Sequence, residues 1–446
     1  MRTVLRRTLK ALGWLTLALL LVVAAWVASN GPWADDAGAP LPPQLAVTSP
    51  AIAPQHNAFF DQLGLRAPAG ESPNVYGQRV MRGEPEAPAQ ALLALPTSAV
   101  WHCQPKTQDC IRLWRAAALP LHEEMARVRE FGQRCLALSS RPGYDEQLMS
   151  RQTSGPLADK PFASYPLPIF AGLSSCLRWF QVTAALAADL RESQDAWGRA
   201  DSLRRRVAGG SKSLISQAMA WSWAASQTQL LAQWLAQTPG ATLDDAWLRP
   251  LPATVLEPST WIKAEAHFQR QIAGDVGMPA QWIFDDEPNL LQRSMNRINL
   301  GYLPHATQRL QDALWLSRLQ QLGSLQGAAL AQQAPVRQAE EEPSLWTLLY
   351  WRNTLGHIVV KIGAPEFLRY FMSQADASAH PQLLQAVVAL NARPPSDRPM
   401  ALAALPLSAE LREQLRLDGD TLVWRGWQHA VEPARAAPLR LPLKPG

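Results

Sequence analysis

The sequence predicts an all-α protein with an N-terminal transmembrane helix, a tether rich in Pro and Ala, a multi-helix body and a small C-terminal β-hairpin. Three observations support this fold class. An uncharged apolar run follows a basic cluster at the N-terminus. Most of the remaining chain carries apolar side chains at helical spacing. Before the C-terminus there is no series of short alternating strands and no βαβ rhythm. We divide the chain into residues 1–29, 30–54 and 55–446.

The first segment has the composition of a membrane anchor. Arg2, Arg6, Arg7 and Lys10 precede an uncharged run over residues 11–28. As a helix this run would measure about 27 Å, close to the roughly 30 Å hydrocarbon core of a bilayer. The basic flank should stay in the cytoplasm, because the segment that follows carries Asp35 and Asp36 and has no Lys or Arg until Arg66. We therefore expect a single-pass membrane protein with the bulk of the chain exported from the cytoplasm.

A secretory signal is the alternative for the same segment. Val27, Ala28 and Ser29 fit the small-residue pattern of a cleavage site. The apolar run is longer than that of most signals, which favours a retained anchor. Both alternatives export the rest of the chain.

The charge of the exported part excludes one class of partner. The whole chain has 42 basic and 37 acidic residues, but residues 1–29 contribute four basic and no acidic side chains. The remainder is therefore nearly neutral. Since duplex binding depends on a concentration of Lys and Arg, we expect no nucleic-acid partner.

The four cysteines are expected to form two disulfides, because exported thiols become oxidised. Cys103 and Cys110 would close a small loop; their spacing fits neither a structural zinc site nor a thiol oxidoreductase motif. Cys135 lies near the end of one expected helix and Cys176 near the start of another, so antiparallel packing would bring them together. For this second pair, free buried thiols are the alternative.

The body begins after an extended tether at residues 30–54, which lacks periodicity. A short helix is expected over 57–65, an irregular stretch over 66–100, and helical segments from Thr107 onward, one of them opened by Pro120. The following list gives the other elements that we expect: helices over 173–207, 213–237, 258–273, 289–300, 305–332, 344–352, 364–374, 380–391 and 408–416, and a hairpin over 416–427.

The chain is rich in tryptophan, with 18 residues, most of which fall within helical patterns. Packing in the core explains them better than a ligand platform does. We expect burial of the tryptophans in the following list: Trp179, Trp197, Trp221, Trp223, Trp234, Trp315 and Trp346.

Motifs of known chemistry are incomplete. His122 opens half of a metalloprotease signature, but Ala126 stands where the second His is required. Residues 209–213 (GGSKS) lack the Gly that precedes the Lys of a P-loop and the final Gly of a nucleophile elbow. Residues 285–287 group three carboxylates, although a helix N-terminal flank explains them as well. We therefore assign no catalytic, cofactor or metal residues.

Four segments of the chain stand out, in chain order NAFFDQLGL, the Cys103/Cys110 segment, GGSKSLISQAMA and YWRNTLGHIVVKIGAPEFLRYF. Together they resemble landmarks of a family of uncharacterised membrane-anchored proteins of Gram-negative bacteria. That family has an Asn-Pro-x-Gly turn where this chain has residues 353–356, NTLG. The resemblance implies an envelope protein of a Gram-negative bacterium, so the membrane would be the inner membrane and the bulk of the chain would lie in the periplasm. It carries no activity or residue roles.

The sequence favours a non-catalytic envelope protein that interacts with another envelope component. An exported hydrolase is the alternative, with His122, His267, Asp285 and Asp286 as candidates that converge from separate helices. A deep pocket that holds at least one His beside a carboxylate would favour the hydrolase over the non-catalytic protein. A third possibility, a carrier of an apolar ligand, would require a closed cavity without charged groups.

Overall fold

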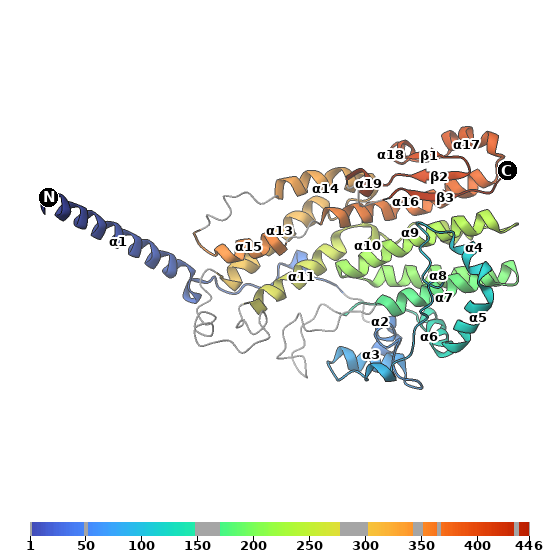
Figure 1. Ribbon diagram of the computed structural model, residues 1–446, viewed down its shortest axis with the longest axis horizontal. Helices are drawn as coiled ribbons and strands as arrows, with labels where there is room; N and C mark the ends of the chain where they lie inside the picture. The colour runs from blue at the N-terminus through green and yellow to red at the C-terminus, as the bar shows by residue number, and fades with distance from the viewer. Residues whose placement is uncertain are drawn as a thin grey trace.

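The computed structural model describes residues 2–48, 52–147, 170–276, 302–341, 351–363, 367–431 and 437–445. Helix α1 (Arg2–Asn30) projects from one end of the body, and the C-terminal strands lie at the other end (Figure 1). Within α1, Thr8–Asn30 is long and apolar enough to cross a membrane, and no part of its most apolar window is buried in the protein. The remaining helices pack side by side along the body.

The first half of the body is a succession of helices that ends in a helical hairpin. The bounds are α2 (Ala58–Leu63), α3 (Pro73–Met81), α4 (Cys110–Ala116), α5 (Ala118–Arg127), α6 (Arg129–Ser139), α7 (Phe170–Leu186), α8 (Leu190–Gly210) and α9 (Leu214–Gln237), with short 3-10 turns η1 (Pro32–Ala34), η2 (Pro43–Leu45), η3 (Pro54–His56) and η4 (Ala89–Ala91).

The second half packs on α9 and ends in a small sheet. The bounds are η6 (Asp245–Leu248), α10 (Ala253–Leu256), α11 (Ser259–Val276), α13 (Pro304–Leu322), α14 (Gly327–Glu341), α15 (Thr354–Gly363), α16 (Leu368–Asn391), η8 (Pro395–Asp397), α17 (Arg398–Ala404), α18 (Ala409–Glu413), β1 (Leu415–Leu417), β2 (Thr421–Trp424), α19 (Trp427–Val431) and β3 (Leu439–Pro442). The all-α prediction is confirmed.

Tryptophan side chains fill the core, as the sequence predicts. Trp197 and Trp234 pack against each other with ring centroids 6.2 Å apart, and both are fully buried. Trp315 packs edge-on against Phe367 in a second cluster. Trp346 lies outside the described residues, and Trp179 is only half-buried.

One expected long helix is in fact two. The sequence predicts a helix over 173–207, but α7 ends at Leu186 and α8 starts at Leu190. Asp189 caps α8 by accepting a hydrogen bond from the Glu192 amide at 2.8 Å, and the Glu192 carboxylate accepts one from the Ala188 amide at 3.1 Å. This arrangement resembles a capping box, except that Glu192 accepts from the residue before the N-cap, and the residue types at 189 and 192 favour it. The predicted start of α9 is confirmed, since the Ser213 hydroxyl accepts from the Ser216 amide.

Other boundaries also differ from the expectation. The stretch 305–332 is interrupted between α13 and α14, where Gly327 has a φ of 50°. The two helices expected over 364–374 and 380–391 are the single helix α16, which continues through Pro381. Helix α3 lies in a stretch expected to be irregular; Ser72 followed by Pro73 is the signal for its start.

The remaining predicted helices divide into three groups. The short helix over 57–65 is α2, and the helix over 258–273 is α11. The helix expected over 408–416 gives way after Glu413 to strand β1. The helix expected over 289–300 and most of that over 344–352 lie outside the described residues.

The C-terminal hairpin is present and has an additional strand. Strands β1 and β2 pair antiparallel, with Leu415 opposite Trp424, and Gly419 turns between them with a φ of 56°. Strand β3 pairs with β2 on the other side. Leu422, Val423 and Leu441 are fully buried, so the sheet seals one end of the helical core.

The cysteines pair as the sequence predicts. Cys103 and Cys110 are at bonding distance with Cα atoms 5.7 Å apart, and Cys135 and Cys176 pair with Cα atoms 5.2 Å apart. The first pair closes the loop before α4. The second ties α6 to α7 across the 41-residue separation of its cysteines.

We expect the two bridges to contribute unequally to stability. Replacing both Cys135 and Cys176 by Ala should lower the free energy of unfolding by about 4 kcal/mol, and replacing Cys103 and Cys110 by about 2.5 kcal/mol. The reason is loop length, because the longer loop loses more conformational freedom in the unfolded chain when it is closed. Denaturant midpoints of the two variants measure the difference. A larger loss for the short loop would contradict this expectation.

Candidate functional site

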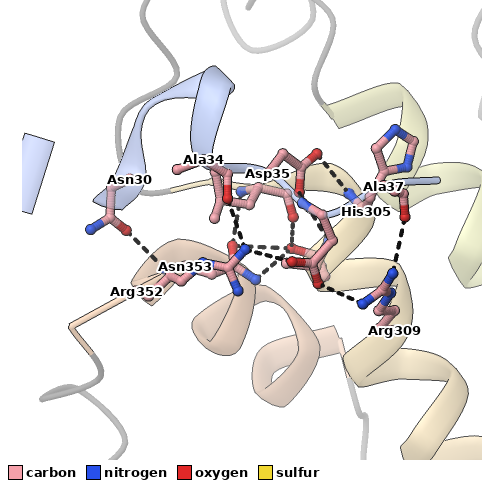
Figure 2. A network of polar contacts seen from close by, with 12 residues as sticks. Asn30, Ala34, Asp35, Ala37, His305, Arg309, Arg352 and Asn353 are labelled. Atoms are coloured by element: carbon pink, nitrogen blue, oxygen red, sulfur yellow. Dashed lines mark hydrogen bonds and ion pairs between the residues drawn. The ribbon is translucent and has the colours of Figure 1, made fainter. Parts of the chain in front are cut away.

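The end of α1 is bonded directly to the body. The Asn30 side chain is fully buried; its amide donates to the Trp351 carbonyl at 2.7 Å, and its oxygen accepts from the Asn353 amide at 2.8 Å (Figure 2). Asn353 has a φ of 56°, a left-handed conformation that Asn tolerates better than most residues do. Its side chain also accepts from the Leu303 amide at 2.8 Å. Asn30 and Asn353 thus join α1 to the starts of α13 and α15.

The two acidic residues that follow α1 bind the same end of the body. Asp35 accepts hydrogen bonds from the His305 and Ala306 amides, both at 3.1 Å, and so caps α13. Asp36 pairs with Arg352 at 2.6 Å and with Arg309 at 3.3 Å. The hydrogen bond from Arg352 holds the pKa of Asp36 below its ordinary value. We call residues 30–37 together with their partners on α13 and before α15 the junction.

The segment after the junction is extended but is not a free tether. The Arg270 guanidinium donates to the Ala39 carbonyl, and Leu45 in η2 is fully buried in the second core cluster. A Cβ on Gly38 would lie 3.3 Å from the His305 ring. The expectation for residues 30–54 rested on composition, which does not reveal the partners that a chain finds elsewhere in the fold.

A cleft of about 310 Å³ opens between α9, α16, α19 and the sheet. Lys106 lines its rim from the loop that the Cys103–Cys110 bridge closes, and Arg369 and Arg425 line it from the other side. No ion pair to a carboxylate is recorded for these three cations among the described residues. The rim is therefore cationic and open to an acidic group.

The floor of the cleft carries a carboxylate. Asp376 accepts hydrogen bonds from the Trp427 amide at 2.7 Å and the Gln428 amide at 3.4 Å, so it caps the start of α19. Gly426 permits this approach with a φ of 76°, and a Cβ there would lie 3.2 Å from Asp376. Burial raises the pKa of Asp376 to about 7.

His380 follows one turn later on α16 and also lines the cleft. Its side chain is buried, its Nδ1 has no hydrogen-bond partner, and its ring packs edge-on against Trp424. Burial lowers the pKa of His380 to about 3. A general base works best with a pKa near the working pH, so this imidazole is poorly suited to accept a proton at neutral pH.

His380 also borders a second, smaller space. This cavity measures about 20 Å³, room for one water molecule, and its walls include the ion pair of Asp201 and Arg204. Such a volume and lining do not suit an apolar ligand.

A buried polar cluster explains the GGSKS stretch. Lys212 forms an ion pair with Asp145 at 2.6 Å. Glu146 accepts hydrogen bonds from the amides of Lys212 and Ser213, at 2.6 and 2.8 Å, and from the hydroxyls of Ser213 and Ser216, both at 2.6 Å. Asp145 and Glu146 are 0% and 1% exposed. The stretch therefore anchors the start of α9 and does not bind a phosphate.

The structure does not bring the predicted catalytic candidates together. His122 is exposed on α5, and His267 lies on α11 beside Gln271. Asp285 and Asp286 lie outside the described residues. Sequence reasoning missed the cleft residues Asp376 and His380, whose spacing of four on a helix is a weak signal by itself. No group of three or more His, Cys, Asp or Glu side chains that could hold a metal ion occurs within the described ranges.

Comparisons with known proteins add no assignment, since no family model, curated protein or solved structure matches the chain.

Asp376 should give the protein a characteristic dependence of stability on pH. Its pKa is about 7 in the folded state and about 3.9 in an unfolded chain. The folded protein thus holds this proton more tightly, so the stability that Asp376 contributes is fully present below about pH 4 and is lost as the pH rises through 7. Replacing Asp376 by Asn should flatten this decline in denaturant midpoints between pH 5 and 8. An unchanged decline would contradict the role given to Asp376.

Proposed function

We propose that the protein is held in the bacterial inner membrane by a retained α1 and faces the periplasm, where it acts as a non-catalytic interaction component of the cell envelope. The junction is the observation that carries this proposal. Asn30 is the last residue of α1 and is also fully buried against the body. Because its last residue packs in the folded body, α1 contributes to the structure of the protein, which a cleaved signal would not do.

The junction favours a retained anchor over a cleaved signal. Val27, Ala28 and Ser29 are helical residues of α1, and the Trp33 indole donates to the Ala28 carbonyl at 2.9 Å. Cleavage after Ser29 would remove Ala28 and leave the Trp33 indole without this acceptor. Helix α1 is not buried in the body, which leaves lipid as its natural surrounding.

The orientation follows from charge and from the disulfides. Arg2, Arg6, Arg7 and Lys10 lie at the end of α1 that should remain cytoplasmic. The two cysteine pairs suit an oxidising compartment. The resemblance to a Gram-negative family of anchored proteins agrees with this placement.

The cleft is the best candidate for the interaction itself. Its volume lies at the lower end of the range for ligand sites, about 300–1,000 Å³. Lys106, Arg369 and Arg425 favour an acidic group from the partner. A hydrolase is less favoured. Although His380 stands beside Asp376 in one cleft, no hydrogen bond recorded in the described residues links them, and the low pKa of His380 opposes base catalysis.

Site-directed crosslinking in intact cells tests the interaction. A photoreactive residue replaces Arg425 at the rim of the cleft, and a control replaces Leu119, which is 70% exposed on α5. We expect a discrete adduct from position 425 that fades when Lys106 and Arg369 are changed to Glu, and none from position 119. Recovery of only monomer from both positions would contradict the proposal.

A further inference from the structure

Outside the apolar span of α1, the exposed tryptophans of the described residues lie at the junction. Among the described residues, the exposed tryptophans are Trp14 within the apolar span, Trp33 at 69% and Trp351 at 48%. Most other described tryptophans are buried or half-buried. Leu355, 47% exposed at the start of α15, adds an aliphatic side chain near Trp351. We call Trp33, Trp351 and Leu355 the apolar rim of the junction.

Hydrogen bonds fix the apolar rim at the level of the last turn of α1. The Trp33 indole donates to the Ala28 carbonyl, and its ring lies over Gly31, where a Cβ would collide with it. The Trp351 carbonyl accepts from Asn30 at 2.7 Å. Helices α13 and α15 lie at the end of the body from which α1 projects (Figure 1).

The height of this rim matches a membrane interface. The 23 residues from Thr8 to Asn30 measure about 34 Å as a helix, slightly more than a hydrocarbon core of about 30 Å. If α1 spans the bilayer, its last turn therefore reaches the headgroup layer. Tryptophan is enriched at that depth, because its ring is apolar and its N–H is polar.

The junction also presents two cations. Arg309 and Arg352 are 52% and 45% exposed at their side chains, and both contact Asp36 (Figure 2). Each guanidinium has more donors than this one carboxylate can use, so both can also bind lipid phosphate. An apolar rim beside cations matches the layered chemistry of a phospholipid surface.

We propose that the apolar rim, with Arg309 and Arg352, inserts into the headgroup layer of the phospholipid bilayer that holds α1, and so seats the body on the membrane. This inference rests on the proposed anchor. It adds that the body does not extend freely from the membrane. The junction fixes the distance of the body from the bilayer, and lipid binds the face that carries the apolar rim. A second copy of the chain or another protein would be a different occupant of the same rim.

Quenching of tryptophan fluorescence by brominated phospholipid tests this insertion on the full-length protein. The protein is reconstituted into phosphatidylethanolamine–phosphatidylglycerol vesicles in which bromine is carried high on the acyl chains. Three variants are compared with the unmodified chain: Trp14→Phe with Trp26→Phe, Trp33→Phe with Trp351→Phe, and all four changes together. The first pair reports on the span, and the second pair on the rim.

We expect the Trp14/Trp26 variant to keep substantial quenching, and the further change of Trp33 and Trp351 to remove most of what remains. The rim side chains are exposed, so these replacements should leave the fold intact. Changing Trp33 and Trp351 could leave quenching unaltered, both alone and in the fourfold variant. In that case the apolar rim does not contact lipid, or another protein covers it, and the proposed insertion of the rim is wrong. If quenching does not depend on Trp14 and Trp26 either, α1 is not in the bilayer and the proposed anchor itself fails.

Discussion

Replacing Lys212 by Met is expected to lower the free energy of unfolding by about 3–5 kcal/mol. The change removes the ammonium that pairs with Asp145 at 2.6 Å and leaves that fully buried carboxylate without its cation. The neighbouring residue, Glu146, is a second buried carboxylate, so it cannot compensate for the lost positive charge. Because the cluster holds the start of α9, the central helix of the body, denaturant unfolding should report the full effect.

A matched replacement isolates the buried charge. Lys106 is exposed at the rim of the cleft, and its change to Met should alter stability by no more than about 0.5 kcal/mol. Combining Lys212→Met with Asp145→Asn should recover part of the loss, because the second change removes the uncompensated charge. Equal effects of the two Lys→Met changes would show that the buried pair is not important for the fold.

Replacing Asn353 by Ala should lower the free energy of unfolding by about 2–4 kcal/mol. The change leaves the Leu303 amide and the Thr307 hydroxyl without the partner they have in Asn353. It also places a residue with no local polar group at a φ of 56°. Because Asn353 joins α13, α15 and the end of α1, we expect faster amide hydrogen exchange over residues 30–37 as well as a lower denaturant midpoint.

Asn353→Gly separates the two causes of this loss. Glycine adopts the left-handed conformation freely, so this variant should regain about 1 kcal/mol relative to Ala while still lacking the side-chain hydrogen bonds. Exchange over residues 30–37 should remain fast in both variants. Slow exchange there in the Ala variant would show that the junction does not depend on Asn353.

Local signals account for the part of the fold that the sequence predicts. The hairpin turn at residues 418–420, the serine cap of α9 and the periodicity of α11 each depend on residues close in the chain. The disulfide pairing also followed from local reasoning, since helix ends and compartment were enough to choose it. The break at Asp189, which the sequence analysis missed, also has a local signal, namely an Asp followed three residues later by a Glu.

The remaining features depend on residues far apart in the chain. Asn30 bonds to Trp351 and Asn353, more than 300 residues away, so composition alone predicts a free tether where the structure has a docked segment. The cleft is similar, because Lys106, Asp376 and Arg425 meet only after α9, α16 and the sheet have packed. A pattern within one segment cannot reveal either feature.

Reporter fusions at the C-terminus test the central claim, which is that α1 anchors the chain and exports everything after it. The account predicts that alkaline phosphatase fused after Gly446 is active in bacterial cells and fractionates with the membrane, whereas a green fluorescent protein exported unfolded at the same position stays dark. An inactive phosphatase together with a fluorescent partner would place the body in the cytoplasm and contradict the anchor's orientation, the role of the disulfides and the envelope assignment together.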